Sequence, residues 1–221
     1  FIFLGIGEFE NARKNYKQNN KFVFFPFCVD STFWKSKGEY KPSKRNKILF
    51  IGNDGNREFE KVIEIAKLMK NREFLFVSSN IEINSVKLEN VEVISGNWNK
   101  SLLTDIEVRD IYERSLITIL PLKNTLQPSG QSVTLQSMSC GVPVIISNTK
   151  GFWDSDNFKN NVHLIKLEDN SIDSWISKIN KILENKELLN KISQNGVDLI
   201  GKKYDINKFN EYLEKTIIID K

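Results

Sequence analysis

Two polar loops hold the residues best suited to chemistry. One has the sequence GNDGNRE (residues 52–58) and the other KNTLQPSGQS (residues 123–132), and each follows a run of apolar residues. Gly130 lets the main chain approach a ligand closely, and the N–H groups of a helix that begins there carry a partial positive charge. This combination suits phosphate. Arg57 and Lys123 could complete a cationic clamp that neutralises a diphosphate leaving group without a metal ion.

Each of these features also has an ordinary structural explanation. Ser and Gly both suit helix starts, so the second loop alone leaves a phosphate site and a plain helix start equally open. Arg57 by itself is more typical of a surface arginine. Small residues of the following helix could merely let it lie close to a sheet: Ser132, Ser137 and Ser139.

Alternating strand and helix patterns place both loops at one edge of a sheet. Apolar runs predict six strands, over residues 47–53, 73–79, 91–97, 116–122, 142–149 and 161–167. Apolar residues at helical spacing predict helices around residues 57–70, 108–112 and 129–140, and three more after residue 171. Continuous apolar strands separated by helices indicate an α/β fold with a doubly wound parallel sheet. Such sheets bind ligands beyond the carboxyl ends of their strands, where both loops lie.

Single residues predict where helices begin and end. Asp54 or Asn56 could cap the helix over 57–70, and Asp205 could cap the last helix. Gly141 accepts the left-handed conformation that ends a helix, and the following Pro143 prevents its resumption.

Two reactive residue types are better explained by structure than by catalysis. His163 falls within the predicted strand over 161–167 and is expected to be a structural or surface histidine. Cys140 is expected to be a small buried residue, because no base is visible that would activate a nucleophilic thiol.

The composition excludes several classes of protein. The chain has 221 residues, of which 40% are hydrophobic and 27% charged, which favours a packed core over disorder. No apolar run reaches the roughly 20 residues that cross a bilayer. Two distant cysteines favour a reducing compartment, and one histidine without a Cys-x-x-Cys motif excludes the common zinc sites.

The charge pattern bears on possible partners. The net charge is only +4. The sequence has no basic stripe interleaved with aromatic residues, so nucleic acid is not expected as a partner. The densest basic stretch, KPSKRNK (residues 41–47), is most simply a solvated linker, although it could attract an anionic lipid surface or a phosphorylated substrate.

The sequence predicts three consecutive parts of the chain. Phe1 opens directly into an apolar run, which favours a fragment of a longer protein. Residues 1–42 then comprise a strand–helix–strand tail of a preceding domain and a linker. Residues 43–205 form the sheet domain, and residues 206–221 form a C-terminal helix.

Several stretches resemble group 1 glycosyltransferases of the GT-B fold. PSGQSVTLQSMSCGVPVI (128–145) resembles their donor-binding segment, because SMSCGVPV matches its Ala-Met-Ala-x-Gly-x-Pro-Val-type ending. PFCVDSTFW (26–34) resembles the stretch that leads from their first domain into the second. KILFIGN (47–53) resembles the strand that opens the donor domain, and YERSLITILPL (112–122) resembles the helix and strand before the donor loop.

This resemblance implies the Rossmann-like C-terminal half of a two-domain enzyme. Such an enzyme moves a sugar from a nucleotide diphosphate to a saccharide or lipid-linked acceptor, with no cofactor, no metal and a retaining outcome. In the family the donor lies mainly in the second domain and the acceptor mainly in the first, so this part alone is expected to be inactive. The final helix, 206–218, would cross back to the first domain. A role in polysaccharide biosynthesis is expected, in the cytoplasm or at the inner face of the membrane.

Carried over by position, the family's motif assigns donor-binding roles. The diphosphate would be met by four consecutive residues: Ser129, Gly130, Gln131 and Ser132. Gln127 falls near the family's first Glu, which touches the donor sugar, and Gln136 falls at the second Glu, which usually holds the ribose hydroxyls. Further donor contacts are expected at glycines and a polar residue at the ends of predicted strands: Gly52, Asn53 and Gly96.

The sequence also departs from the family's pattern. Gln127 and Gln136 are amides where the family has carboxylates, and they lie one residue further apart. An amide still bonds a hydroxyl, but it is uncharged and a weaker acceptor. The usual Gly-Arg and Lys-Gly of the first loop are missing, since Asn53 follows Gly52 and Arg57 comes later. Three functions therefore stay open: a glycosyltransferase, a sugar-nucleotide epimerase, which would need titratable acid–base groups, and a non-catalytic nucleotide-sugar-binding module.

Overall fold

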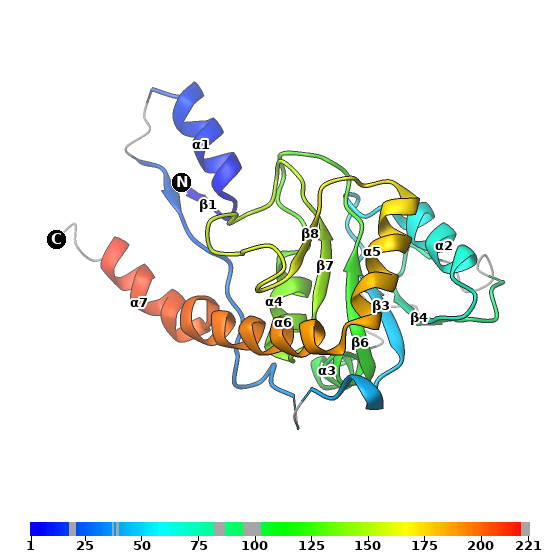
Figure 1. The fold of residues 1–221 in the computed structure, drawn as a ribbon. Helices are drawn as coiled ribbons and strands as arrows, with labels where there is room; N and C mark the ends of the chain where they lie inside the picture. Colours follow the sequence, from blue (N-terminus) through cyan, green and yellow to red (C-terminus); the bar gives the residue numbers. More distant parts are fainter. Residues whose placement is uncertain (18–20, 37, 39, 82–86, 95–102, 218–221) are drawn as a thin grey trace.

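The computed structural model describes residues 1–221 except 18–20, 37, 39, 82–86, 95–102 and 218–221. Within the described residues, the main sheet has six strands in the order β5-β4-β3-β6-β7-β8, and every neighbouring pair is parallel (Figure 1). The strands are β3 (Lys47–Ile51), β4 (Glu73–Val77), β5 (Val91–Ile94), β6 (Ser115–Leu120), β7 (Val144–Ser147) and β8 (Ile165–Leu167). The predicted α/β fold with a parallel sheet is confirmed.

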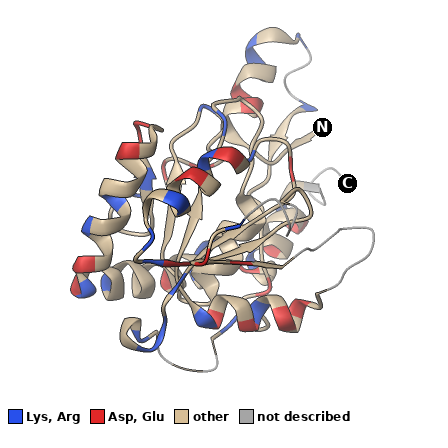
Figure 2. Cartoon of the chain, turned by 90° about the vertical axis from the view of Figure 1, so that its right-hand side faces the viewer, with Lys and Arg blue, Asp and Glu red and all other residues tan. Residues whose placement is uncertain are grey.

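Helices cover both faces of this sheet. Because side chains of a strand point alternately to opposite faces, Ile48 and Phe50 of β3 pack on one face and Leu49 on the other. The first face is covered by α2 (Phe59–Leu68) and α5 (Ile172–Glu184), and the second by α3 (Asp105–Arg114) and α4 (Gln131–Ser139). Figure 2 shows most charged residues on helices and loops. Burial on both faces explains why the strands read as continuous apolar runs.

The last third of the chain is helical, as predicted. Helix α6 (Lys186–Leu199) continues through a π-helical turn (Ile200–Tyr204) toward α7 (Ile206–Ile217). Outside this part, a short 3₁₀ turn (Pro42–Lys44) precedes β3. Asp205 caps α7, since its Oδ1 accepts the N–H of Asn207 at 2.9 Å. Across the described residues, none of the helices combines the length and apolar character that crossing a bilayer requires.

The first 25 residues form a unit apart from the main sheet. Strands β1 (Ile2–Phe3) and β2 (Val23–Phe24) pair in parallel, and α1 (Ile6–Asn15) connects them. The ring of Phe25 meets those of Phe209 and Tyr212 on α7, with centroids 5.6 and 4.9 Å apart. Accordingly, α7 extends to the side of the molecule where β1 lies (Figure 1). The predicted strand–helix–strand unit is confirmed, and its assignment to a preceding domain stays a prediction.

The structure corrects two local predictions. The residue that precedes α2 is Glu58, and neither Asp54 nor Asn56 caps this helix, because the Asp54 carboxylate accepts the N–H of Asn56 instead. His163 lies in a turn before β8 rather than in a strand. Its N–H bonds the carbonyl of Lys159 and its Nδ1 accepts the N–H of the same residue, which closes the turn.

Small residues in and after α4 behave as predicted. Gly141 follows the helix with a φ of +71°, the left-handed conformation expected there. Ser137 is buried, and its hydroxyl lies 2.7 Å from that of Thr118 on β6. The small side chain thus lets α4 lie close to the sheet.

Candidate functional site

The strand order brings two loops together at the carboxyl edge of the sheet. Strands β3, β4 and β5 follow one another outward, and the chain then returns to pair β6 with the other side of β3. A crevice forms where the order reverses in this way. Here the loops after β3 and β6 line a cavity of about 460 Å³. It contains most of the predicted site residues: Gly52, Asn53, Arg57, Gln127, Ser129, Gly130, Gln131 and Ser132.

Main-chain hydrogen bonds fix the two loops to each other. The N–H of Lys123 donates to the carbonyl of Asn56 at 2.9 Å, and the N–H of Glu58 donates to that of Pro121 at 3.0 Å. Arg57 and Leu122 pair as an antiparallel bridge. The loops therefore hold Arg57 in a defined place opposite residues 129–132.

The Arg57 side chain is buried and directed into the site. It is only 3% exposed, so the alternative of a surface arginine is wrong. Its Nη1 donates to the Ser129 hydroxyl at 2.6 Å and lies 2.9 Å from Oδ2 of Asp54. Burial lowers the pKa of Arg57 while the Asp54 carboxylate opposes the shift, and a guanidinium stays protonated. Its Nε is buried without a hydrogen-bond partner among the described residues.

The start of α4 presents main-chain donors to the same cavity. Gly130 precedes the helix with a φ of +80°, and no side chain caps it. Within the described part of the chain, the N–H groups of Gly130, Gln131 and Ser132 make no hydrogen bond. Free N–H groups at a helix start favour an anion. The guanidinium of Arg57 lies opposite this helix start, which supports the interpretation of the loop as a phosphate site.

Several lining residues use their side chains to hold the loops. Asn53 Oδ1 accepts the Ser78 hydroxyl at 3.0 Å and the Ser79 N–H at 2.7 Å, which braces the loop after β4. Gln127 Oε1 accepts from the amide of Asn56 at 3.3 Å. Gln131 Nε2 donates to the carbonyl of Leu4 at 2.7 Å and so ties this loop to the N-terminal unit.

Two of the predicted site residues do not line this cavity, Gln136 and Lys123. Gln136 Oε1 accepts from the Tyr112 hydroxyl at 3.3 Å, and Gln136 does not line the cavity. Lys123 lines a neighbouring cavity, where its Nζ donates to the carbonyl of Gly55 at 2.9 Å. Gly96 lies outside the described residues. The roles assigned to these residues stay predictions.

Comparison with known proteins shows the family of this chain. The family model for glycosyl transferases group 1 matches residues 33–198. The chain belongs to this family. Among curated proteins, no significant match was found.

Three solved structures with the fold of this group 1 chain share 12–16% of its sequence. A glycosyltransferase from Rickettsia africae is 16% identical with a TM-score of 0.76, over 100% of this chain and 64% of its own. HepE from Anabaena, solved with UDP and glucose, is 12% identical with a TM-score of 0.76, over 98% of this chain and 62% of its own. The group 1 chain thus spans less than two thirds of the length of both.

A third neighbour is shorter. The C-terminal domain of LpcC, a group 1 family protein from Francisella tularensis, is 15% identical with a TM-score of 0.62. The match covers 80% of the group 1 chain and 99% of that domain. At such identities these likenesses establish a shared fold.

Asp54 and Phe27 also line the cavity of this group 1 chain, and the sequence alone did not assign them to it. The signal for Asp54 was its position three residues before Arg57, a spacing at which oppositely charged side chains can pair. Phe27 lies within the linker stretch PFCVDSTFW, which pointed to the family but carried no expected ligand contact.

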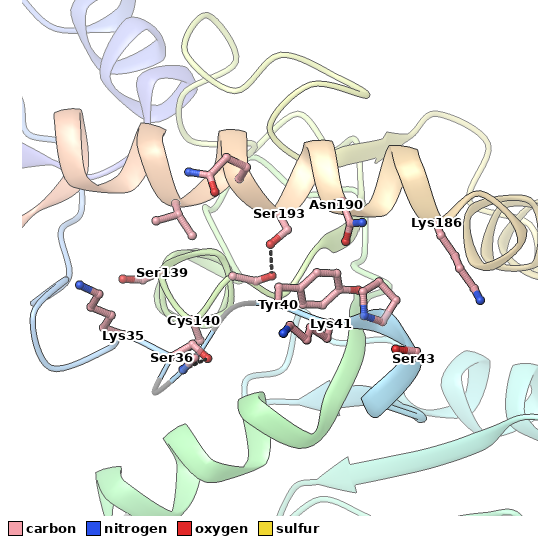
Figure 3. A pocket seen from close by; sticks show the side chains of 15 residues that line it. Lys35, Ser36, Tyr40, Lys41, Ser43, Ser139, Cys140, Lys186, Asn190 and Ser193 are labelled. Atoms are coloured by element: carbon pink, nitrogen blue, oxygen red, sulfur yellow. Dashed lines mark hydrogen bonds between the residues drawn. The ribbon is translucent and has the colours of Figure 1, made fainter.

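A larger cavity, of about 700 Å³, lies at the other end of α4 (Figure 3). The buried hydroxyl of Ser193 donates to the carbonyl of Gly141 at 2.6 Å, and the Tyr40 hydroxyl donates to that of Leu116 at 2.7 Å. Cys140 is buried there, and burial raises its thiol pKa to about 12, as suits the small core residue predicted. The Ser193 bond supports the turn that follows α4, and the Tyr40 bond ties residue 40 to the start of β6.

Proposed function

We propose that this group 1 domain binds a nucleotide-diphosphate sugar and transfers the sugar to a saccharide or lipid-linked acceptor. The reaction is retaining and needs no metal cofactor. One observation carries the proposal: the buried guanidinium of Arg57 faces the uncapped start of α4 across the cavity at the switch point. The structure of HepE with UDP and glucose supports a nucleotide sugar as the ligand class.

The cavity offers donors suited to a diphosphate leaving group. The N–H groups of residues 130–132 would bind its oxygens, and Arg57 would bind them from the opposite loop. Donors that are already in place stabilise the charge that grows as the sugar–phosphate bond breaks. Because loop-to-loop hydrogen bonds hold these groups, little reorganisation is needed during the reaction.

The acceptor would be held by a further domain. The chain spans 64% of the length of the Rickettsia africae protein, and its strands β1 and β2 form a parallel pair apart from the main sheet. We assign residues 1–42 to the tail of an acceptor domain and its linker, residues 43–205 to the donor domain, and residues 206–221 to the helix that returns. The enzyme would act in the cytoplasm or at the inner face of the membrane.

Calorimetry with UDP, GDP and their sugars tests the donor site. The 221-residue chain should bind one of these nucleotides with a dissociation constant below the millimolar range, and EDTA should leave the affinity unchanged. The matching nucleoside should bind more weakly, since it lacks the diphosphate. If the folded chain binds none of these ligands at millimolar concentration, the proposal is wrong.

A second candidate is a module that binds nucleotide sugar without turnover. Gln136 favours it, because the residue at the position of the family's second Glu is an uncharged amide bonded to Tyr112 outside the cavity. Full-length protein that binds donor yet transfers sugar to none of a panel of saccharides and lipids would support this candidate. Labelled sugar on any acceptor would exclude it, and NMR of the product's anomeric proton would show whether transfer is retaining.

A further inference from the structure

The Asp54 carboxylate occupies the donors that a phosphate would use. Its Oδ2 lies 2.9 Å from Arg57 Nη1, and its Oδ1 accepts from the Ser129 hydroxyl at 3.0 Å. The same Oδ1 accepts the N–H of Asn56 at 2.9 Å. The carboxylate therefore bridges the two loops and is the counter-charge of Arg57.

The two partners differ sharply in their exposure. Arg57 is 3% exposed, whereas the Asp54 side chain is 47% exposed. A buried guanidinium without a counter-charge is costly, so the carboxylate stabilises the ligand-free site. Once a ligand phosphate replaces it on Arg57, the Asp54 carboxylate can rotate into water, because its side chain is already 47% exposed. A bound diphosphate and an ionised Asp54 would repel each other if both stayed against Arg57.

We propose that Asp54 is an internal competitor of the donor's diphosphate. In the ligand-free site its carboxylate takes the place of a phosphate oxygen on Arg57 and Ser129, and the ligand must displace it. Asp54 thus lowers the affinity for the nucleotide and keeps Arg57 in place between turnovers. The inference rests on the proposed function of this site, and it assigns Asp54 the role of setting its affinity.

The Asp54→Asn variant tests the competition. Asn keeps the side-chain oxygen that accepts the Asn56 N–H but removes the charge. Calorimetry with pyrophosphate and UDP should show binding about three- to tenfold tighter than in the wild-type chain, and uridine should bind unchanged. Glu60→Gln is the matched control, because it removes the same charge from an exposed position in the first turn of α2. It should change the affinity by less than about twofold.

Thermal unfolding gives a second readout. Without anion, Asp54→Asn should melt below the wild-type chain, and added pyrophosphate should raise its melting temperature by more than that of the wild type. If Asp54→Asn does not fold, Asp54→Ser replaces it, because its hydroxyl can also accept the Asn56 N–H.

The outcomes separate this inference from the proposed function. If the wild type binds UDP and the variant binds it equally or more weakly, Asp54 does not compete, and the donor site stands. If Glu60→Gln raises the affinity for UDP as much as Asp54→Asn does, the effect is one of general electrostatics, and the proposed competition is wrong. If neither the wild type nor the variant binds a nucleotide diphosphate, both the donor site and the competition are wrong.

Discussion

Gly52 and Arg57 are packed so closely that residue 52 has no room for a side chain. A Cβ on Gly52 would lie 2.4 Å from Arg57 Nε and 2.9 Å from Nη2. Gly52 also has a φ of +148°, a conformation that other residues rarely adopt. The glycine that follows β3 therefore leaves the space in which the guanidinium reaches the start of α4.

Gly52→Ala should displace Arg57 and weaken anion binding. We expect the affinity for UDP to fall about tenfold or more, and the affinity for uridine to stay nearly unchanged, because a hydrogen bond to a charged group contributes about 1.5–3 kcal/mol. Calorimetry on both ligands measures the difference. Gly55→Ala is the matched control in the same loop, since a Cβ there meets nothing within 4 Å. Equal affinities in Gly52→Ala and the wild type would show that Arg57 does not depend on this glycine.

Arg57→Ala should weaken binding of nucleotide diphosphates far more than binding of nucleosides. The variant removes the guanidinium that bonds Ser129 and faces the start of α4. We expect a loss of about ten- to a hundredfold for UDP or GDP, measured by calorimetry against uridine or guanosine. Arg57→Lys should recover only part of the affinity, because an ammonium is a point charge without the planar fork. Equal losses for nucleotide and nucleoside would refute a phosphate role for Arg57.

The sequence predicted the frame of the site better than its interior. The apolar runs over 47–53 and 116–122 sufficed to place two loops at one sheet edge, because hydrophobic burial is a local signal. Side-chain pairing is not local. Ser129 meets Asp54 across 75 residues, and Gln131 meets Leu4 across 127. The sequence therefore named most of the residues around the cavity but not their partners.

Other hydrogen bonds explain the two local predictions that were wrong. The pattern NVHLIKL (161–167) alternates like a strand, yet hydrogen bonds between Lys159 and His163 close a turn first, and β8 begins only at Ile165. Asp54 precedes a helix as a capping residue would, but its carboxylate is engaged by Arg57 and Ser129. Tertiary partners outweighed local preference in this loop.

Tyr204→Phe should destabilise the fold. The Tyr204 hydroxyl is buried and donates to Asp154 Oδ2 at 2.6 Å, and Asp154 is itself buried. Loss of this donor leaves a buried carboxylate with fewer partners, which costs about 1–3 kcal/mol of unfolding free energy. Urea unfolding of both proteins measures this. Tyr112→Phe is the control, because its equally buried hydroxyl makes only long bonds of 3.3 and 3.4 Å. Losses of equal size in both variants would contradict the special role of Tyr204.

Stability should fall in acid partly through Asp205. Burial raises the pKa of this carboxyl, but hydrogen bonds from Ser31 and Asn207 outweigh burial and hold the pKa below its ordinary value of 3.8. A carboxyl whose pKa is lower in the folded state stabilises the fold above its ordinary pKa, and this contribution is lost as the pH falls toward the folded value. As the pH is lowered below about 4, the unfolding free energy of Asp205→Asn should therefore fall less than that of the wild type. Parallel curves for the two proteins would exclude this contribution.

The most direct test is a crystal structure of the chain soaked with UDP and GDP, or with their sugars. The account predicts diphosphate oxygens within hydrogen-bond distance of the N–H groups of residues 130–132 and of the Arg57 guanidinium. It also predicts that the Asp54 carboxylate has turned away from Arg57. A nucleotide bound elsewhere, or a diphosphate that leaves Arg57 and the start of α4 untouched, would contradict it.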